Sequence, residues 1–519
     1  MISKNNKLLL SCKKRENILF YGCFFIAFVF LCLTLYDCFF NYIWFDEVFS
    51  LYIIENSYAG VITQTALDVH PPFYYFILKI AVDLVKLFCP SVNVIVLSKI
   101  ISMLSAIITF YFCYYVLSKE FNKTISSVFV VLFFALNGIL DLTTEIRMYG
   151  YCSLFLVLCF YYATKIIRYN KTKDWVFLTI FFVCAAYSHN YSLIASAAIV
   201  AYLLLYHICH RRKDLKKAIL FTTLMAALYI PWLVVLIKQI TTIHGNYWIG
   251  ETPIHSILKY AFFFNLFDAS YDFIFVFVIL FNILNIIILV INIRSKVISL
   301  ENKWTAGIGL FSTSIVFAFG IIFSVLVDPI FIERYTNCVV AVYYLSVIYN
   351  FYLFFKTTTL NCNRWFKYLE LTLTILSIIC FTFCSIKNIT SLIKDNLKYE
   401  RNSIELNKLV NDESVNYIVM DNIMAQEVFE YTHRDKDVYC LNEYDCYGPH
   451  ADNFKHKVLT FEEISDKITL GNRILYLSTS KDFDKFKDNN LDLKMIGSAN
   501  GYIVGMDNVV IYELENLEG

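Results

Sequence analysis

The sequence predicts an α-helical membrane protein that crosses the bilayer about eleven times and ends in a small soluble α/β domain. Of its 519 residues, 58% are hydrophobic and only 17% are charged, and long apolar runs recur up to about residue 388. Soluble globular chains carry about a quarter charged residues, so the composition indicates a polytopic membrane protein. The net charge of +1 gives no electrostatic reason to expect a nucleic acid as partner.

The predicted spans are apolar runs close to the roughly 17–25 residues that a membrane helix needs. The run at 175–188 is short and is joined almost directly to the next one. In chain order the eleven runs are 18–40, 96–117, 124–141, 149–167, 175–188, 191–208, 218–237, 273–293, 304–327, 337–355 and 367–386.

Lysine and arginine are distributed unevenly between the two sides that these spans define. The N-terminal segment, the even-numbered connections and the adjoining span ends with Lys165 and Lys367 hold 22 of them, whereas the odd-numbered connections hold 6. Positive residues favour the cytoplasmic side. We therefore expect a cytoplasmic N-terminus and an extracytoplasmic C-terminal domain in a multi-pass protein of the cell membrane. The first span lacks a small-residue cleavage site and is expected to stay as an anchor.

The chain is expected to form two domains, a membrane domain over 1–388 and a soluble extracytoplasmic α/β domain over 389–519. The first outer loop, 41–95, includes an apolar stretch at 73–88 that carries two lysines and an aspartate on one helical face. Such a helix is expected to lie in the membrane interface with its aromatic face in lipid.

The C-terminal segment shows strand-length apolar runs separated by helical patterns. It contains no nucleophile motif or phosphate-binding loop, so we expect it either to contact an acceptor or partner or to be a structural cap. Cys440 and Cys446 fit either a disulfide or two free thiols. The predicted strands are Val415–Met420, Asp437–Leu441, Arg473–Ser478 and Val509–Leu514, and the predicted helices are Asn422–His433 and Phe461–Ile468.

Charged and polar residues gather in the predicted outer loops, whereas the spans are almost free of charge. Carboxylates at a membrane boundary are costly to hold near lipid, which favours a functional site over packing. The candidates are Asp46, Glu47, Asp68, His70, Asp141, Glu145, Arg147, His189, Asp328, Glu333, Arg334 and Tyr335.

Sugar transfer from a polyprenyl phosphate is a reaction that would use such a set. An acceptor hydroxyl must lose a proton as it attacks the anomeric carbon, and a carboxylate can take that proton. The leaving lipid phosphate gains negative charge, which arginine stabilises well because it stays charged and binds phosphate oxygens in a fork.

Five short motifs resemble a known superfamily. "FDEV" after the first span resembles the carboxylate motif of protein O-mannosyltransferases. "DVHPPFYY", "EIRMYG", "SHNYSL" and "DPIFIERY" are similar, in this order, to bacterial relatives that include the aminoarabinose and galacturonate transferases of lipopolysaccharide. The resemblance covers roughly residues 18–350 and leaves the C-terminal segment outside it.

The resemblance implies a GT-C fold, a polyprenyl-phosphate-sugar donor, and an inverting single displacement with no obligatory nucleotide cofactor. It makes Asp46 the candidate base, and Glu47 the residue that orients it or touches the acceptor. Arg147 and Arg334 would hold the donor phosphate. His70 would lie near that phosphate, at a position where aminoarabinose transferases carry Lys before Pro-Pro. Lesser candidates are Lys79 for the phosphate, and Asp68, Glu145 and Tyr335 in the site.

The cofactor and partner expectations follow from the same reading. No spacing of ligand residues demands a metal, although the loop acids leave weak binding of a divalent ion open. The donor is a hexosyl or pentosyl lipid phosphate, and the acceptor is an envelope protein, glycan or lipid. Two other functions remain as alternatives: a transporter or lipid flippase, and a non-catalytic scaffold whose outer domain binds a partner.

Each candidate also has a purely structural interpretation. Asp46 suits the N-cap of a helix over Val48–Asn56. Arg147 and Arg334 each have nearby acids to pair with. His70 would only fix the Pro-Pro turn, His189 would be a hydrogen-bonded boundary histidine, and Lys79 would extend to lipid headgroups.

Overall fold

The structure is a computed structural model, and it describes most of the chain. The described residues are 2–40, 42–136, 143–243, 272–361, 364–441, 457–478, 484–499 and 509–517. They form two compact units. The first comprises Met1–Tyr36, Val69–Pro90 and Ser98–Thr390, and the second comprises Asp37–Asp68, Ser91–Leu97 and Ser391–Gly519.

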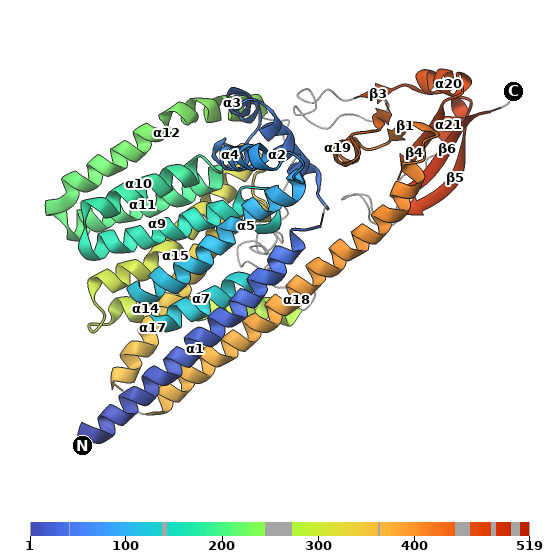
Figure 1. Cartoon of the computed structure of the whole chain (residues 1–519). Helices are drawn as coiled ribbons and strands as arrows, with labels where there is room; N and C mark the ends of the chain where they lie inside the picture. The colour runs from blue at the N-terminus through green and yellow to red at the C-terminus, as the bar shows by residue number, and fades with distance from the viewer. Residues whose placement is uncertain are drawn as a thin grey trace. The chain divides into compact units, whose positions relative to one another are not determined.

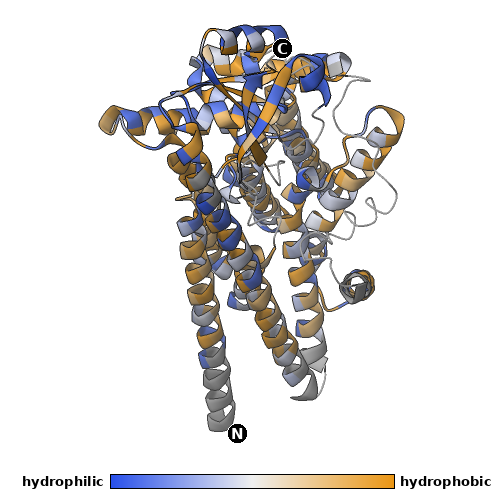
Figure 2. Ribbon diagram, turned by 90° about the vertical axis from the view of Figure 1, so that its right-hand side faces the viewer, coloured by the Kyte–Doolittle hydropathy of each residue, from blue (hydrophilic) through white to orange (hydrophobic). Residues whose placement is uncertain are grey.

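The first unit is helical, and its long helices are mostly apolar along their length (Figures 1 and 2). Helices α9, α10, α11 and α15 lie side by side in it (Figure 1). Its helices are α1 (Ile2–Asp37), α4 (Phe73–Phe88), α5 (Val94–Phe112), α6 (Ser118–Glu120), α7 (Lys123–Ala135), α9 (Tyr149–Tyr169), α10 (Thr172–Ala186), α11 (Asn190–His210), α12 (Leu215–Ile243), α14 (Asp272–Arg294), α15 (Leu300–Leu326), α16 (Glu333–Thr336), α17 (Val340–Asn361) and α18 (Arg364–Val410).

Eight segments of the described chain are helical, long and apolar enough to cross a membrane. They are Glu16–Asp37, Val94–Glu120, Tyr149–Tyr169, Asn190–His210, Arg212–Thr242, Leu300–Leu326, Arg334–Thr357 and Leu371–Val410. Each overlaps a predicted span, but the last continues 24 residues past the predicted end at 386, and its residues from Ser391 belong to the second unit.

The predicted count of eleven spans is not confirmed. The other three predicted runs coincide with α7, α10 and α14, of which α7 has 13 residues and α10 has 15. At about 1.5 Å per residue, helices of this length fall short of a hydrocarbon core of about 30 Å. Among the described residues, Lys123–Ala135 and the part Ile279–Arg294 of α14 are apolar helices shorter than a span.

Polar contacts join the segments that were predicted to lie on the cytoplasmic side. The Arg168 guanidinium donates to the Glu120 carboxylate at 3.0 Å and to the Tyr349 hydroxyl at 3.0 Å. The Lys217 ammonium donates to the carbonyl of Asn170 at 2.9 Å. Connections that lie far apart in the sequence therefore meet at one end of the bundle, as the alternating topology requires.

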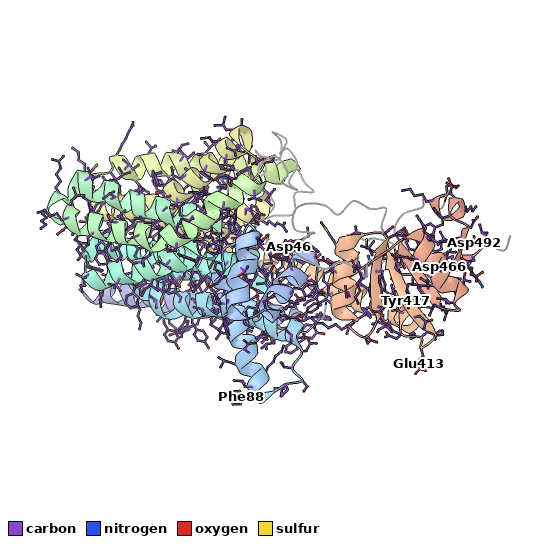
Figure 3. The ribbon with its side chains drawn as sticks, turned by 90° about the horizontal axis from the view of Figure 1, so that it is seen from above. Asp46, Phe88, Glu413, Tyr417, Asp466 and Asp492 are labelled. Atoms are coloured by element: carbon purple, nitrogen blue, oxygen red, sulfur yellow. The ribbon has the colours of Figure 1, made fainter. Side chains whose placement is uncertain are left out.

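Helix α4 has the predicted position in the sequence but buries a different face. Tyr74 and Tyr75 are fully buried, and the Tyr74 hydroxyl lies 2.7 Å from the Ser102 hydroxyl. The exposed residues are aliphatic ones such as Leu84, together with Phe88 at the helix end (Figure 3). The expectation that its aromatic face lies in lipid is therefore wrong, because the tyrosine side chains pack inside the protein, where a hydroxyl can find a partner.

The second unit combines the C-terminal residues with part of the predicted first outer loop. Helices α2 (Phe45–Glu55) and α3 (Tyr58–Leu67) belong to it. Tyr42 stacks on Tyr399 of α18 with ring centroids 4.0 Å apart, and Tyr52 meets Tyr431 edge to face at 5.2 Å.

The C-terminal part of this unit is the predicted α/β domain. Its six-stranded sheet has the order β3-β2-β1-β4-β6-β5, in which β3, β2, β1 and β4 run parallel, β6 is antiparallel to β4, and β5 is antiparallel to β6 at the edge. The elements are β1 (Val415–Met420), α19 (Ile423–Thr432), β2 (Asp437–Leu441), β3 (Val458–Leu459), α20 (Phe461–Thr469), β4 (Arg473–Ser478), α21 (Asp484–Asp488), β5 (Leu491–Ala499) and β6 (Val509–Asn516).

All four predicted strands and both predicted helices of this domain are present. Its polar surface includes Glu413, Tyr417, Asp466 and Asp492 (Figure 3). Of the cysteines discussed above, Cys440 is buried in β2, whereas Cys446 lies outside the described residues.

Candidate functional site

The Pro71-Pro72 turn lies against the connection between α10 and α11. The residue before a proline is disfavoured in the helical region, so Pro71 is held out of the helix; Pro72 is the N-cap and α4 begins at Phe73. The Phe73 N–H donates to the Tyr187 carbonyl at 2.9 Å, and the Asn190 side-chain amide donates to the Val69 carbonyl at 2.9 Å. These two bonds hold His70 beside His189.

Five aromatic rings from four segments pack together at this point. The His70 and His189 rings are stacked, with centroids 5.1 Å apart. Tyr335 lies edge-on to both, at 5.9 Å from His70 and 5.0 Å from His189. Tyr149 and Tyr191 lie 5.5 and 5.9 Å from His189. Residues predicted to share one face of the membrane are thus in direct contact.

Both candidate phosphate-binding arginines lie close to this ring cluster. Arg147 is 3% exposed at the start of α9, and the guanidinium carbon of Arg334 lies 5.8 Å from the centroid of the Tyr335 ring. Burial, together with the positive charges of Arg147 and Arg334, lowers the pKa of His189 to about 3. Two cations and a neutral imidazole therefore occupy the same small volume.

A cavity of about 290 Å³ opens beside the cluster. Most of its wall is apolar and comes from α11, α12 and α15, and its polar groups include the two histidines and Asp328. It is lined by Val69, His70, His189, Asn190, Tyr191, Leu193, Ile194, Leu236, Gln239, Ile240, Phe319, Phe323, Asp328, Ile330 and Tyr335. This lining matches the chemical character of a molecule with a long apolar chain and a small polar head group.

Two buried polar atoms at this cavity have no hydrogen-bond partner within the part of the chain that the structure describes. They are Nε2 of His189 and Oδ1 of Asn190. Leaving a buried polar group unpaired costs about 1–3 kcal/mol. Such atoms on a cavity wall indicate where a bound molecule would be polar.

Asp46 and Glu47 belong to the second unit, on α2. Asp46 is half-buried in the first helical turn (Figure 3). Glu47 is 3% exposed, and its carboxylate accepts the Trp44 N–H at 3.0 Å. The interpretation of Asp46 as N-cap is therefore wrong: Trp44 is the N-cap, two residues earlier than predicted.

Three lesser candidates have identifiable structural partners. Asp68, also in the second unit, is the C-cap of α3 and is 5% exposed. Lys79 is 7% exposed, forms an ion pair with Asp83 at 3.1 Å and does not line the cavity. The Glu145 carbonyl accepts the Arg147 N–H at 2.7 Å, so its backbone helps to place the arginine.

Two residues named with the arginines lie beyond what the structure describes. Asp141 falls outside the described residues, as does the side chain of Glu333. Within the described ranges, no three His, Cys, Asp or Glu side chains lie close enough together to hold a metal ion.

Sequence reasoning undervalued His189 and missed Gln239. His189 does have the expected structural role, since its Nδ1 accepts the Tyr191 N–H at 3.1 Å at the start of α11. The same residue lines the cavity, and its Nε2 is buried without a partner among the described residues, which only tertiary packing reveals. Gln239 sits in the apolar helix α12, and no nearby motif distinguishes it.

Comparison with known proteins agrees with this architecture. Residues 69–235 match the family model described as dolichyl-phosphate-mannose-protein mannosyltransferase. This segment contains His70, Lys79, Glu145, Arg147 and His189. No curated protein sequence matches the chain.

Two solved structures of ArnT from Cupriavidus metallidurans have the same fold. The apo structure matches with a TM-score of 0.54 and 9% identity, covering 86% of this chain and 87% of ArnT. The structure bound to undecaprenyl phosphate matches with a TM-score of 0.58 and 9% identity, covering 96% and 97%. The protein has the GT-C fold, as predicted, and residues 69–235 resemble the mannosyltransferase family.

Proposed function

We propose that the protein transfers a sugar from a polyprenyl-phosphate donor to an acceptor in the cell envelope. The observation that carries the proposal is the position of Arg147 and Arg334 near His189, which itself lines an apolar cavity. Guanidinium groups match a phosphate, and the apolar wall matches the first part of a prenyl chain.

The positively charged groups near His189 suit the departure of a lipid phosphate. As the bond between the anomeric carbon and the phosphate oxygen breaks, negative charge grows on the phosphate. Fixed positive groups in a site shielded from water stabilise that charge more than they stabilise the intact donor. Arg147 is 3% exposed, so it offers a preorganised and poorly hydrated guanidinium.

Asp46 is the proposed base, on the strength of the "FDEV" motif alone. Its carboxylate would accept the proton of an acceptor hydroxyl or amine as that group attacks the anomeric carbon from the side opposite the phosphate. One displacement of this kind inverts the anomeric configuration. We expect Glu47 to act through the helix start that it caps rather than through the reaction.

The orientation of the protein in the membrane is proposed from the distribution of lysine and arginine between the connections. We propose that the N-terminus is cytoplasmic, that the ring cluster and cavity face the outside, and that the C-terminal α/β domain is extracytoplasmic. A donor assembled on the inner leaflet would then have to be translocated before this protein uses it.

The test is turnover of a panel of undecaprenyl-phosphate sugars, hexoses and pentoses, by the purified full chain. Wild type is expected to release the sugar from one donor to water or, faster, to an added envelope extract. Asp46→Asn should bind the same lipid and lose transfer by a factor of about a hundred or more. Turnover that persists in Asp46→Asn would refute Asp46 as base, and failure with every donor would favour a transporter or scaffold.

A further inference from the structure

The environment of His189 sets which of its nitrogens carries a proton. Nδ1 accepts the Tyr191 N–H at 3.1 Å, so in the neutral ring the hydrogen must be on Nε2. The side chain is 1% exposed, and rings of His70, Tyr149 and Tyr335 surround it. The imidazole cannot easily rotate to exchange the two nitrogens.

The same environment keeps this ring uncharged. Burial is the larger cause of the lowered pKa, and the guanidinium groups of Arg147 and Arg334 add to it. At neutral pH the ring is therefore a neutral N–H donor, and it is unsuited to act as a proton-releasing acid.

His189 lines the cavity, and its buried Nε2–H group has no acceptor among the described residues. A buried donor without an acceptor destabilises the empty protein, so a ligand with an oxygen at this position would gain from meeting it. Two guanidinium groups nearby mean that this oxygen should belong to an anion.

From these contacts we propose that His189 is a direct ligand of the donor phosphate and binds it as a neutral Nε2–H donor beside the two arginines. The inference rests on the proposed function and adds to it a residue that binds the anion without contributing charge. A third cation would hold the free lipid phosphate more tightly and slow its release after transfer. A neutral donor completes the coordination of the phosphate oxygens and adds no net charge.

The test uses His189→Asn in the full-length protein. Asparagine is a good N-cap, so its side-chain oxygen can still accept the Tyr191 N–H, but its short side chain cannot present a donor where Nε2 stands. The matched control is His207→Asn, since His207 is a fully buried histidine of the same helix that does not line the cavity.

Binding is measured by native mass spectrometry of the solubilised protein with undecaprenyl phosphate and with undecaprenol, which has the same chain and no phosphate. We expect His189→Asn to weaken binding of undecaprenyl phosphate about tenfold and to leave undecaprenol unchanged. The control variant should change neither affinity. An equal loss for both lipids would assign His189 to packing and overturn the inference while leaving the proposed function intact.

Two further measurements separate the remaining outcomes. In wild-type protein, the ¹⁵N signal of the His189 Nε2–H should shift on adding undecaprenyl phosphate and stay unchanged with undecaprenol, and no shift with either would refute the contact. In a competition experiment, inorganic phosphate is added to wild type and to His189→Asn, each loaded with undecaprenyl phosphate. Displacement of the lipid from wild type alone would show that His189 contacts the phosphate group itself. If wild type binds the two lipids equally, the proposed function fails as well.

Discussion

The imidazole rings of His70 and His189 lie stacked, with centroids 5.1 Å apart and planes inclined by 28°. They come from segments almost 120 residues apart, which meet because the Asn190 amide donates to the Val69 carbonyl. This contact brings the Pro-Pro turn to the start of α11. It places the two histidines on the wall of an otherwise apolar cavity, and both arginines lie near enough to His189 to lower its pKa.

Replacing either arginine should weaken phosphate binding. Arg147→Gln or Arg334→Gln removes a charge-assisted interaction of about 1.5–3 kcal/mol, so we expect affinity for undecaprenyl phosphate to fall about tenfold to a hundredfold. Removing a nearby cation should also raise the pKa of His189, because both arginines contribute to its lowering. Native mass spectrometry and the ¹⁵N signals of His189 report the two effects. Lys238→Gln, at an exposed position of α12, is the control and should change neither.

Glu47 should be important for folding of α2 rather than for catalysis. Glu47→Ala removes the acceptor of the Trp44 N–H and should destabilise the helix start by about 0.5–2 kcal/mol, whereas Glu47→Gln keeps an acceptor oxygen. Hydrogen–deuterium exchange over Phe45–Glu55 should therefore quicken in the alanine variant alone. A folded Glu47→Gln protein without transfer activity would instead give Glu47 a direct part in the reaction.

Glu427 makes the second unit sensitive to pH. Burial, with a smaller effect of Glu430, raises the pKa of this carboxyl to about 8, above its ordinary value near 4.5. The folded state then holds a proton that the unfolded state has lost, so stability is greatest below about pH 4.5. It falls as the pH rises toward 8, by about 1.4 kcal/mol per unit at most.

Glu427→Gln should remove this dependence and protect α19 at pH 8. Hydrogen–deuterium exchange of Ile423–Thr432 in the full chain, compared at pH 6 and pH 8 after correction for intrinsic exchange, measures it. The comparison variant is Glu413→Gln, on the polar surface before β1, which should behave as wild type (Figure 3). Equal pH dependence in wild type and Glu427→Gln would contradict the explanation.

Two natural cysteines of the first unit test the orientation. Cys89 follows α4 and Cys209 lies near the end of α11, and both are exposed. In single-cysteine variants, a membrane-impermeant maleimide added to intact cells should label Cys89, and it should label Cys209 only after permeabilisation. The reverse pattern would invert the proposed topology, and labelling of both from outside would break the assignment of alternating loops.

Much of the fold follows from patterns that are local in the sequence. The strands from Val415 and Arg473 were predictable because short apolar runs between turns form buried strands. The edge strand Leu491–Ala499 was missed because Asp492 and Lys494 alternate with its apolar residues on a solvated face.

The site was only partly predictable. Topology alone places Arg147 and Arg334 on one face, and the structure brings both near His189. The buried face of α4 was not predictable, because an amphipathic pattern does not distinguish lipid from protein as the partner of the apolar side. For the same reason nothing in the sequence indicated that Gln239 would line the cavity.

The most direct measurement is a cryo-electron microscopy structure of the full chain with undecaprenyl phosphate. The account predicts density for the phosphate at the polar end of the cavity, within hydrogen-bond distance of His189 Nε2 and of at least one of the two arginines, with the prenyl chain along the apolar wall of α11, α12 and α15. A phosphate bound elsewhere, with this cavity empty or filled by the chain alone, would contradict the account.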